Sequence, residues 1–236
     1  MKAAIVTGAS SGIGMEISRI LLENHYKVFG FGRDFSGIVI EDRNFYPIIC
    51  DLTEVDVLTE KVKEICSKEE IHTLVNNAGA GYFGPHEELN GKKIHEMVIT
   101  NLEVPMIITQ LVLRQIKENA GYIFNISSVT AQKSNTHGCA YGATKAGLTS
   151  FSKSLFDEVR KYGVKVVTIH PDMTRSNFYR HADFCEGETE DTYLTPEETA
   201  KAVEFILTQR DGMVITELTL QPQKHQIRRI NIQKEE

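Results

Sequence analysis

The stretch that decides the fold reads Thr7-Gly8-Ala9-Ser10-Ser11-Gly12-Ile13-Gly14. An apolar run expected to form a strand at 2–7 leads directly into it, and an apolar helical pattern follows it. Glycines let the backbone turn tightly, and they let a pyrophosphate approach the free N–H groups at the start of a helix. The stretch therefore predicts a turn that binds a dinucleotide.

The spacing of these glycines, G-x-x-x-G-x-G, differs from the widespread dinucleotide fingerprint G-x-G-x-x-G. Alone, a glycine cluster of this kind is a weak signal, because a tight strand-to-helix turn without any ligand needs the same residues. The interpretation therefore depends on what the rest of the chain adds.

Short β-type runs alternate with helical stretches along the rest of the chain. This rhythm predicts an α/β fold: a single Rossmann-type, doubly wound domain over residues 1–236, with a seven-stranded parallel sheet and helices on both faces. The strands are expected at 2–7, 27–32, 45–50, 72–76, 121–126, 164–170 and 213–220.

Two segments interrupt the alternation, 33–44 after the second strand and 171–195 after the sixth. A loop as long as the second one is uncommon in a compact domain unless it has a function. We therefore expect a substrate lid at about 171–195, and a merely variable surface loop is the alternative.

The composition of the chain argues against several classes of protein. Its 26 basic and 32 acidic residues give a formal charge of -6, which predicts no general attraction to nucleic acid or to an anionic membrane. The locally basic end, 224–234, is interpreted as a solvated tail.

The four cysteines form no CxxC pair, so neither a metal site nor a disulfide framework is expected. No leader is recognised and no apolar run approaches roughly eighteen residues, so we expect a soluble, cytoplasmic protein.

Three further motifs fall where ligands bind in open α/β sheets, at or near the carboxyl ends of strands. The fourth expected strand ends in Asn76-Asn77-Ala78-Gly79, and the fifth ends in Ser127-Ser128. Tyr141 and Lys145 follow, four residues apart at the start of a predicted helix, so they share one helix face. A cation there favours the phenolate, so we expect Lys145 to lower the pKa of Tyr141 toward working pH, where the phenol can donate or accept a proton.

Together, the motifs TGxxxGxG, NNAG, Ser and YxxxK resemble the short-chain dehydrogenase/reductase family, from residue 3 to about 175 in family order. The resemblance implies that Tyr141 is the proton donor and acceptor, that Ser128 hydrogen-bonds the substrate carbonyl, and that Lys145 also holds the nicotinamide ribose. The implied catalytic residues are Asn101, Ser128, Tyr141 and Lys145. The expected cofactor contacts are Gly8, Ser10, Ser11, Gly12, Ile13, Gly14, Arg33, Asp51, Leu52, Asn77, Ala78, Gly79, Tyr141, Lys145, Pro171 and Thr174.

Some of these assignments have alternatives in the sequence itself. Asn101 matches the family position thought to hold a proton-relaying water, but an asparagine four residues before Pro105 can also satisfy backbone groups near a helix kink. The family commonly has Pro-Gly after the sixth strand, whereas this chain has Asp172 after Pro171. His137 and His170 have no partner at triad or metal spacing, so we expect them at the surface or at a sheet edge.

The choice of nicotinamide cofactor depends on the end of the second expected strand. NAD-preferring members usually carry a carboxylate there, and an arginine nearby accommodates the 2′-phosphate of NADP. Here Gly32 occupies the expected acid position and Arg33 follows, which favours NADP(H) over NAD(H). Asp34 keeps NAD open, because it lies at nearly the usual distance from Gly14, and a strand two residues longer would reverse the preference.

We therefore expect an oxidoreductase that transfers a hydride between NADP(H) and a small ketone, aldehyde or hydroxy acid. The resemblance also implies a homodimer or homotetramer. The alternatives are an NAD-dependent alcohol dehydrogenase, an epimerase or dehydratase using the same Tyr141 and Lys145 pair, and a catalytically silent NAD(P)-binding regulator.

Overall fold

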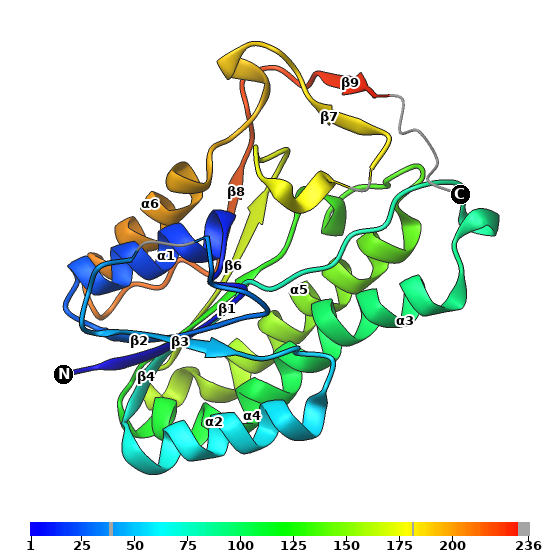
Figure 1. Cartoon of the computed structure of the whole chain (residues 1–236). Helices are drawn as coiled ribbons and strands as arrows, with labels where there is room; N and C mark the ends of the chain where they lie inside the picture. The colour runs from blue at the N-terminus through cyan, green and yellow to red at the C-terminus, as the bar shows by residue number, and fades with distance from the viewer. Residues whose placement is uncertain (38–39, 181, 231–236) are drawn as a thin grey trace.

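The computed structural model describes residues 1–37, 40–180 and 182–230. Its centre is a seven-stranded sheet in the order β3-β2-β1-β4-β5-β6-β8, in which every neighbouring pair is parallel (Figure 1). The strand order reverses between β1 and β4, which is where such sheets bind ligands. The strands are β1 (Ala3–Thr7), β2 (Lys27–Gly32), β3 (Phe45–Ile49), β4 (Ile71–Asn76), β5 (Tyr122–Ile126), β6 (Lys165–Pro171) and β8 (Glu217–Leu220).

The predicted Rossmann-type fold is confirmed, and the strand limits differ mainly at the end of the sheet. The seventh strand was expected from Met213, but β8 begins only at Glu217. Its pairing with β6 starts where Thr168 meets Glu217, and in the described part of the chain 213–216 belongs to no strand. The apolar pattern alone therefore overestimated the length of this strand.

Helices cover both faces of the sheet because the side chains of each strand alternate between two cores. Ala3 and Ile5 of β1 join the core beneath α2 (Val55–Lys68), α4 (Val104–Glu118) and α5 (Cys139–Val159). Ala4 and Val6 join the opposite core, beneath α1 (Gly12–Glu23) and α6 (Pro196–Leu207). Figure 1 shows these two layers on either side of the strands.

A continuous helical run precedes β5. It consists of α3 (Gly91–Val98), the π-helical turn η2 (Ile99–Glu103) and α4. By length and composition this run is apolar enough to cross a membrane, which corrects the expectation that no segment reaches that length. The finding is weak evidence, because a core helix of a soluble protein passes the same test, and α4 packs its buried residues against the sheet.

The segment 171–195, expected to be a lid, contains three short elements, which are η5 (Asn177–Tyr179), β7 (Phe184–Glu186) and η6 (Glu190–Thr192). Strand β9 (Ile227–Arg229) pairs antiparallel with β7 above the carboxyl edge of the main sheet (Figure 1). The remaining short turns are η1 (His86–Glu88), η3 (Val129–Ala131) and η4 (Arg160–Tyr162).

The predicted basic tail at 224–234, of which 231–234 lies outside the described residues, is exposed over 224–230 as expected, but three of its residues form strand β9. Two basic side chains of the tail meet acidic ones of the 171–195 segment. Lys224 Nζ lies 2.7 Å from Asp191, and an Arg228 guanidinium nitrogen lies 2.9 Å from Glu188. Residues 224–230 are held in place because their charges and their backbone have partners in this segment.

Candidate active site

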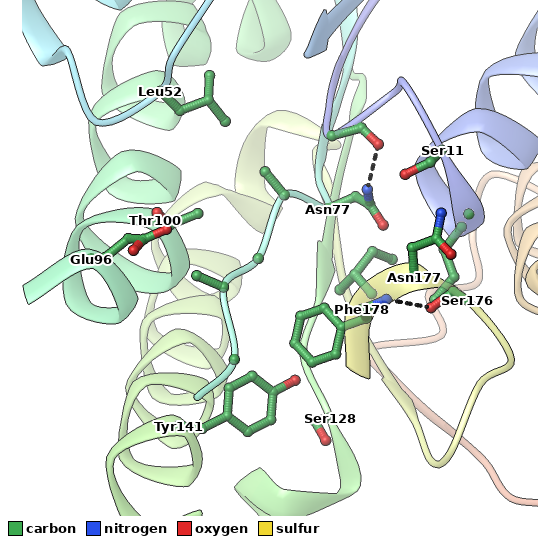
Figure 2. Close-up of a pocket in the computed structure, with 18 of the residues that line it drawn as sticks. Ser11, Leu52, Asn77, Glu96, Thr100, Ser128, Tyr141, Ser176, Asn177 and Phe178 are labelled. Atoms are coloured by element: carbon green, nitrogen blue, oxygen red, sulfur yellow. Dashed lines mark hydrogen bonds between the residues drawn. The ribbon is translucent and has the colours of Figure 1, made fainter. Parts of the chain in front are cut away.

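A cavity of about 770 Å³ opens at the carboxyl ends of the central strands. All of the expected site residues line it except Gly14 and Asn101 (Figure 2). The sequence motifs, which are far apart in the chain, are therefore brought together around one space, as the topology requires.

The glycine-rich turn forms one wall of this cavity. Gly8 and Gly12 have φ values of 67° and 54°, a conformation that side-chain-bearing residues rarely adopt. Neither the N-cap Ser11 side chain nor an acidic residue in the first turn of α1 satisfies the N–H groups there, so they remain available to an anion. Gly14 lies behind the wall, where a Cβ atom would stand 2.3 Å from the Gly8 carbonyl oxygen, so it permits close packing instead of lining the cavity.

The end of β4 is joined to this turn by side-chain hydrogen bonds. The Asn77 amide donates to the carbonyl oxygens of Thr7 at 2.9 Å and Gly8 at 3.2 Å. In return, the Thr7 hydroxyl oxygen accepts from the backbone N–H groups of Asn77 and Ala78, both at 3.0 Å. Thr7 was not among the expected site residues, yet it fixes the distance between the two loops.

Ser128, Tyr141 and Lys145 meet at the opposite end of the cavity, and all three are buried. The Lys145 amine donates to the Ile126 carbonyl oxygen at 2.8 Å and lies 5.9 Å from the centre of the Tyr141 ring. The Ser128 hydroxyl oxygen accepts from the Thr130 N–H at 3.2 Å and is hydrogen-bonded to Tyr141. Figure 2 shows the hydroxyl groups of Ser128 and Tyr141 on the same side of the cavity.

Burial controls the ionisation of this group. It raises the pKa of Tyr141 well above the usual range, against the opposing effect of the hydrogen bond with Ser128, and it lowers the pKa of Lys145 to about 8. The expected lowering of the Tyr141 pKa by Lys145 is therefore not seen in this structure. The reason is that aromatic side chains bury the Tyr141 ring: the ring centres of Phe83 and Phe178 lie 5.4 and 5.7 Å from its own.

Asn101 lies behind the cavity in the π-helical turn η2, and it is completely buried. Its side-chain oxygen accepts from the Ala80 N–H at 2.8 Å, and its amide donates to the Ala80 carbonyl oxygen and to the Thr144 hydroxyl. These bonds connect the loop after β4 to α5. The bonds run to other segments and not to backbone groups near a kink at Pro105, as the alternative expected, and the proton-relay role stays a prediction.

The end of β2 forms the far end of the cavity. The strand stops at Gly32, as predicted, and a Cβ atom there would stand 2.7 Å from the Cβ atom of Ser10, so no acidic side chain fits this position. Arg33 lines the cavity. Asp34 does not, because its two carboxylate oxygens accept from the N–H and the hydroxyl of Ser36 at 2.8 and 3.0 Å.

Several residues that line the cavity were not among the expected site residues, in the loops after β3 and β4, in the helical run 91–103, at the end of β5 and in the 171–195 segment. The aromatic residues of this segment are the signal that was available, because Phe178 and Tyr179 pack with Phe83 over Tyr141. Phe178 lies against the loop after β4, where a Cβ atom on Gly81 would stand 2.7 Å from its ring. The cavity residues of this segment that sequence reasoning did not consider as contacts are Asp172, Asn177, Phe178 and Tyr179, whereas Ser176 and Arg180 had been weighed as contacts to the cofactor and to an anionic substrate but were not among the expected site residues.

His170 contradicts its predicted surface or edge position. It is completely buried at the end of β6, and its Nδ1 atom lies 3.2 Å from the carbonyl oxygen of Ser128. It was missed because no sequence spacing links a histidine to a serine 42 residues earlier in the chain.

Comparisons with known proteins agree with this geometry. A family model described as short chain dehydrogenase matches residues 2–183. A 3-oxoacyl-(acyl-carrier-protein) reductase FabG of Buchnera aphidicola subsp. Schizaphis graminum is 30% identical over 225 residues, which are 90% of this chain and 92% of that protein.

Two solved structures share the fold. Serine dehydrogenase in a closed form complexed with NADP+ has a TM-score of 0.83 and 27% identity, covering 99% of this chain and 100% of that one. A 4-hydroxyisoleucine dehydrogenase complexed with NADH has a TM-score of 0.83 at 20% identity, covering 94% of this chain and 98% of that one.

Proposed function

This chain belongs to the short-chain dehydrogenase/reductase family and is an NAD(P)-dependent oxidoreductase acting on CH–OH groups, and we propose that it couples NADP(H) to a small ketone, aldehyde or hydroxy acid. The observation that carries the proposal is the meeting of Ser128, Tyr141 and Lys145 at one end of the cavity whose other wall is the glycine turn. The proposal treats residues 1–236 as one catalytic domain with a lid at 171–195.

The residues around the cavity suit a dinucleotide along its whole length. The N–H groups at the start of α1 would hold the pyrophosphate, and Asp51 and Leu52 would border the adenine ring. Pro171 and Thr174 also line the cavity and would contact the nicotinamide, as the family resemblance implies. When bound, the nicotinamide ring supplies or accepts the hydride.

The protein's own residues would handle the proton and the charge on the substrate. Because burial raises the pKa of Tyr141, its phenol is protonated at neutral pH and can donate a proton to the carbonyl oxygen during reduction. The Ser128 hydroxyl would donate a hydrogen bond to the same oxygen as negative charge develops. Lys145, with its pKa at about 8, is mostly a cation at neutral pH and would stabilise the phenolate that Tyr141 leaves behind.

The preference for NADP(H) is supported by the end of β2. Arg33 faces the cavity, the space beside Gly32 excludes an acid, and the Asp34 carboxylate is occupied by Ser36. A guanidinium pairs well with a phosphate, and an exposed carboxylate nearby would repel one. The solved serine dehydrogenase that resembles this chain binds NADP+.

The test is to incubate the pure protein with NADPH and a panel of ketones, aldehydes and 2- and 3-oxo acids, and to follow NADPH consumption. The same panel with NADH tests the cofactor. We expect turnover of at least one class, with NADPH preferred. Faster turnover with NADH would favour an NAD-dependent dehydrogenase, and NADPH binding without turnover of any substrate would favour a silent regulator.

The proposal includes a homodimer or homotetramer, as the family resemblance implies, and a cytoplasmic location. All four cysteines are free thiols, as expected in a reducing compartment. Exposed apolar residues such as Val98 and Met106 on the helical run 91–118 support a subunit contact. Light scattering at micromolar concentration tests the assembly, and a monomeric mass would contradict it.

A further inference from the structure

The catalytic serine sits just beyond the point where the backbone ladder between β5 and β6 ends. The last backbone bond there runs from the Ser127 N–H to the Ile169 carbonyl oxygen at 2.8 Å. One residue further along both strands, the connection is made by a side chain, because His170 Nδ1 lies 3.2 Å from the Ser128 carbonyl oxygen. A carbonyl oxygen only accepts, so Nδ1 carries the hydrogen and the imidazole continues the ladder.

Charged groups behind His170 connect it to the edge strand and to α5. Its Nε2 atom has no hydrogen-bond partner among the described residues and lies 3.8 Å from a carboxylate oxygen of Glu217 on β8. The other oxygen of Glu217 pairs with Lys153 Nζ at 2.8 Å. Lys153 belongs to α5, the helix that carries Tyr141 and Lys145. The His170 imidazole therefore lies between Ser128 and the ion pair of Glu217 with Lys153, which joins β8 to α5.

The imidazole is neutral in this position. Burial is the larger influence and lowers the pKa of His170, although the Ser128 carbonyl and Glu217 act in the opposite direction and Lys153 acts with burial. No water-exposed surface of His170 remains, so its hydrogen bond has no competing partner in solvent. The position of the ring is thus fixed by packing and by its bond to Ser128.

We propose that His170 is a positioning residue, which holds the Ser128 backbone so that the Ser128 hydroxyl faces Tyr141 and the substrate oxygen. The inference rests on the role of Ser128 in the proposed function. The Ser128 carbonyl also accepts from the Ala131 N–H at 3.0 Å, but that bond lies within the short turn η3 and moves with it. His170 ties the start of this turn to β6, whereas the Thr219 hydroxyl of β8 donates to the Gln132 side chain at the other end of the turn.

The test compares two substitutions at one position. His170→Leu fills the space without a donor, whereas the amide of His170→Asn can occupy the Nδ1 position and donate to the same carbonyl. We expect kcat to fall about tenfold in His170→Leu, as for the loss of one hydrogen bond, and to stay within about twofold in His170→Asn. The Kd for NADPH should be unchanged in both, because the glycine turn is not involved.

A double-mutant cycle separates positioning from a general structural role. In a Ser128→Ala background, His170→Leu should cause no further loss of kcat, since the hydroxyl that it positions is already absent. An equal loss in both backgrounds would overturn the proposal. If His170→Leu does not fold, His170→Gln replaces it, because a glutamine amide reaches the Nε2 position instead of the Nδ1 position.

A crystal structure of the His170→Leu variant gives a readout that needs no turnover. We expect the Ser128 hydroxyl to move away from Tyr141, and an unchanged Ser128 would overturn the inference. A failure of the proposed function gives a different result. The unmodified protein would then show no turnover, while Ser128 would still be displaced in the His170→Leu variant.

Discussion

Two buried pairs of tyrosine and lysine lie at opposite edges of the sheet. At the carboxyl edge, Lys145 Nζ lies 5.9 Å from the centre of the Tyr141 ring, and at the amino edge, Lys165 Nζ lies 4.8 Å from the centre of the Tyr122 ring. All four residues are buried. The two pairs thus share composition, burial and proximity, and they differ in what surrounds the lysine.

The surroundings explain why only one pair is a candidate for chemistry. Lys165 has a counter-ion, since its amine lies 3.4 Å from the Asp211 carboxylate at the protein surface. Within the part of the chain that the structure describes, the Lys145 amine donates only to a backbone carbonyl; it lines the cavity, and burial lowers its pKa to about 8. A buried cation beside a cavity with a shifted pKa indicates function, whereas one paired with a carboxylate indicates stability.

The largest expected effect separates the two tyrosines. Tyr141→Phe removes the proposed proton donor while keeping the ring, so we expect kcat to fall about 100-fold or more with little change in NADPH binding. Tyr122→Phe should leave kcat within about twofold, because that hydroxyl lies at the other edge of the sheet. Steady-state kinetics on both variants check this. Near-normal turnover by the Tyr141 variant would remove the mechanism.

The next largest effect is expected from the two lysines, whose substitutions should have different consequences. Lys145→Met deletes the cation beside the phenol, and we expect kcat/KM to fall by about 100-fold, as for loss of a charge-assisted interaction. Lys165→Met should lower the thermal unfolding temperature slightly and leave kcat/KM nearly unchanged. Similar kinetic losses in both variants would show that the comparison reflects only the cost of disturbing a buried lysine.

A smaller effect is expected on cofactor binding, where two neighbouring residues at the carboxyl edge, Arg33 and Asp34, are compared. Arg33→Ala should weaken NADPH binding by about 1.5 kcal/mol, the lower end of the range for a charged hydrogen bond, because Arg33 is exposed. NADH binding should be unchanged, and Asp34→Ala, whose side chain does not line the cavity, serves as the matched control. Fluorescence titrations of NADPH and NADH into both variants and into the unmodified protein measure the dissociation constants. Equal losses for the two cofactors would assign Arg33 to the fold or to the adenine.

The smallest effect concerns acid stability at the amino edge. Burial lowers the pKa of His72 from 6.5 to about 4, and its Nδ1 atom contacts the Tyr26 hydroxyl at 3.1 Å. The unfolded chain binds a proton below pH 6.5 that the folded chain refuses until about pH 4, so stability falls as the pH decreases through this window.

After allowance for solvent screening, we expect a loss of about 1 kcal/mol from this group. Thermal unfolding of the wild type and of His72→Asn, measured on either side of the window, checks it. The variant should lose less stability on acidification, and an identical loss would assign the effect to other groups.

Sequence reasoning predicted the features that depend on local pattern. The glycine turn, the seven strands and the pair of Tyr141 with Lys145 follow from residue spacing, since each is a property of one segment. What it did not predict depends on distant partners. Strand β9 exists because β7 pairs with it, and His170 is buried because β8 and α5 enclose it.

The predicted lowering of the Tyr141 pKa was wrong for the same reason. Spacing shows that Lys145 is near the phenol, but it does not show that Phe83 and Phe178 exclude water from it. Asn101 is a related case, because its partners Ala80 and Thr144 belong to two other segments. Local pattern identifies which residues meet, and the packing of remote residues decides how they behave.

The pairing of β7 with β9 has a practical consequence for handling the protein. The Ile230 N–H donates to the Asp183 carbonyl oxygen at 2.8 Å, so a label or substitution beside β9 would disturb the segment 171–195, part of which lines the cavity. Met1, by contrast, is exposed and precedes β1 at the amino edge of the sheet (Figure 1). Fluorophores and immobilisation chemistry placed at Met1 would therefore lie at the opposite edge of the sheet from β7 and β9.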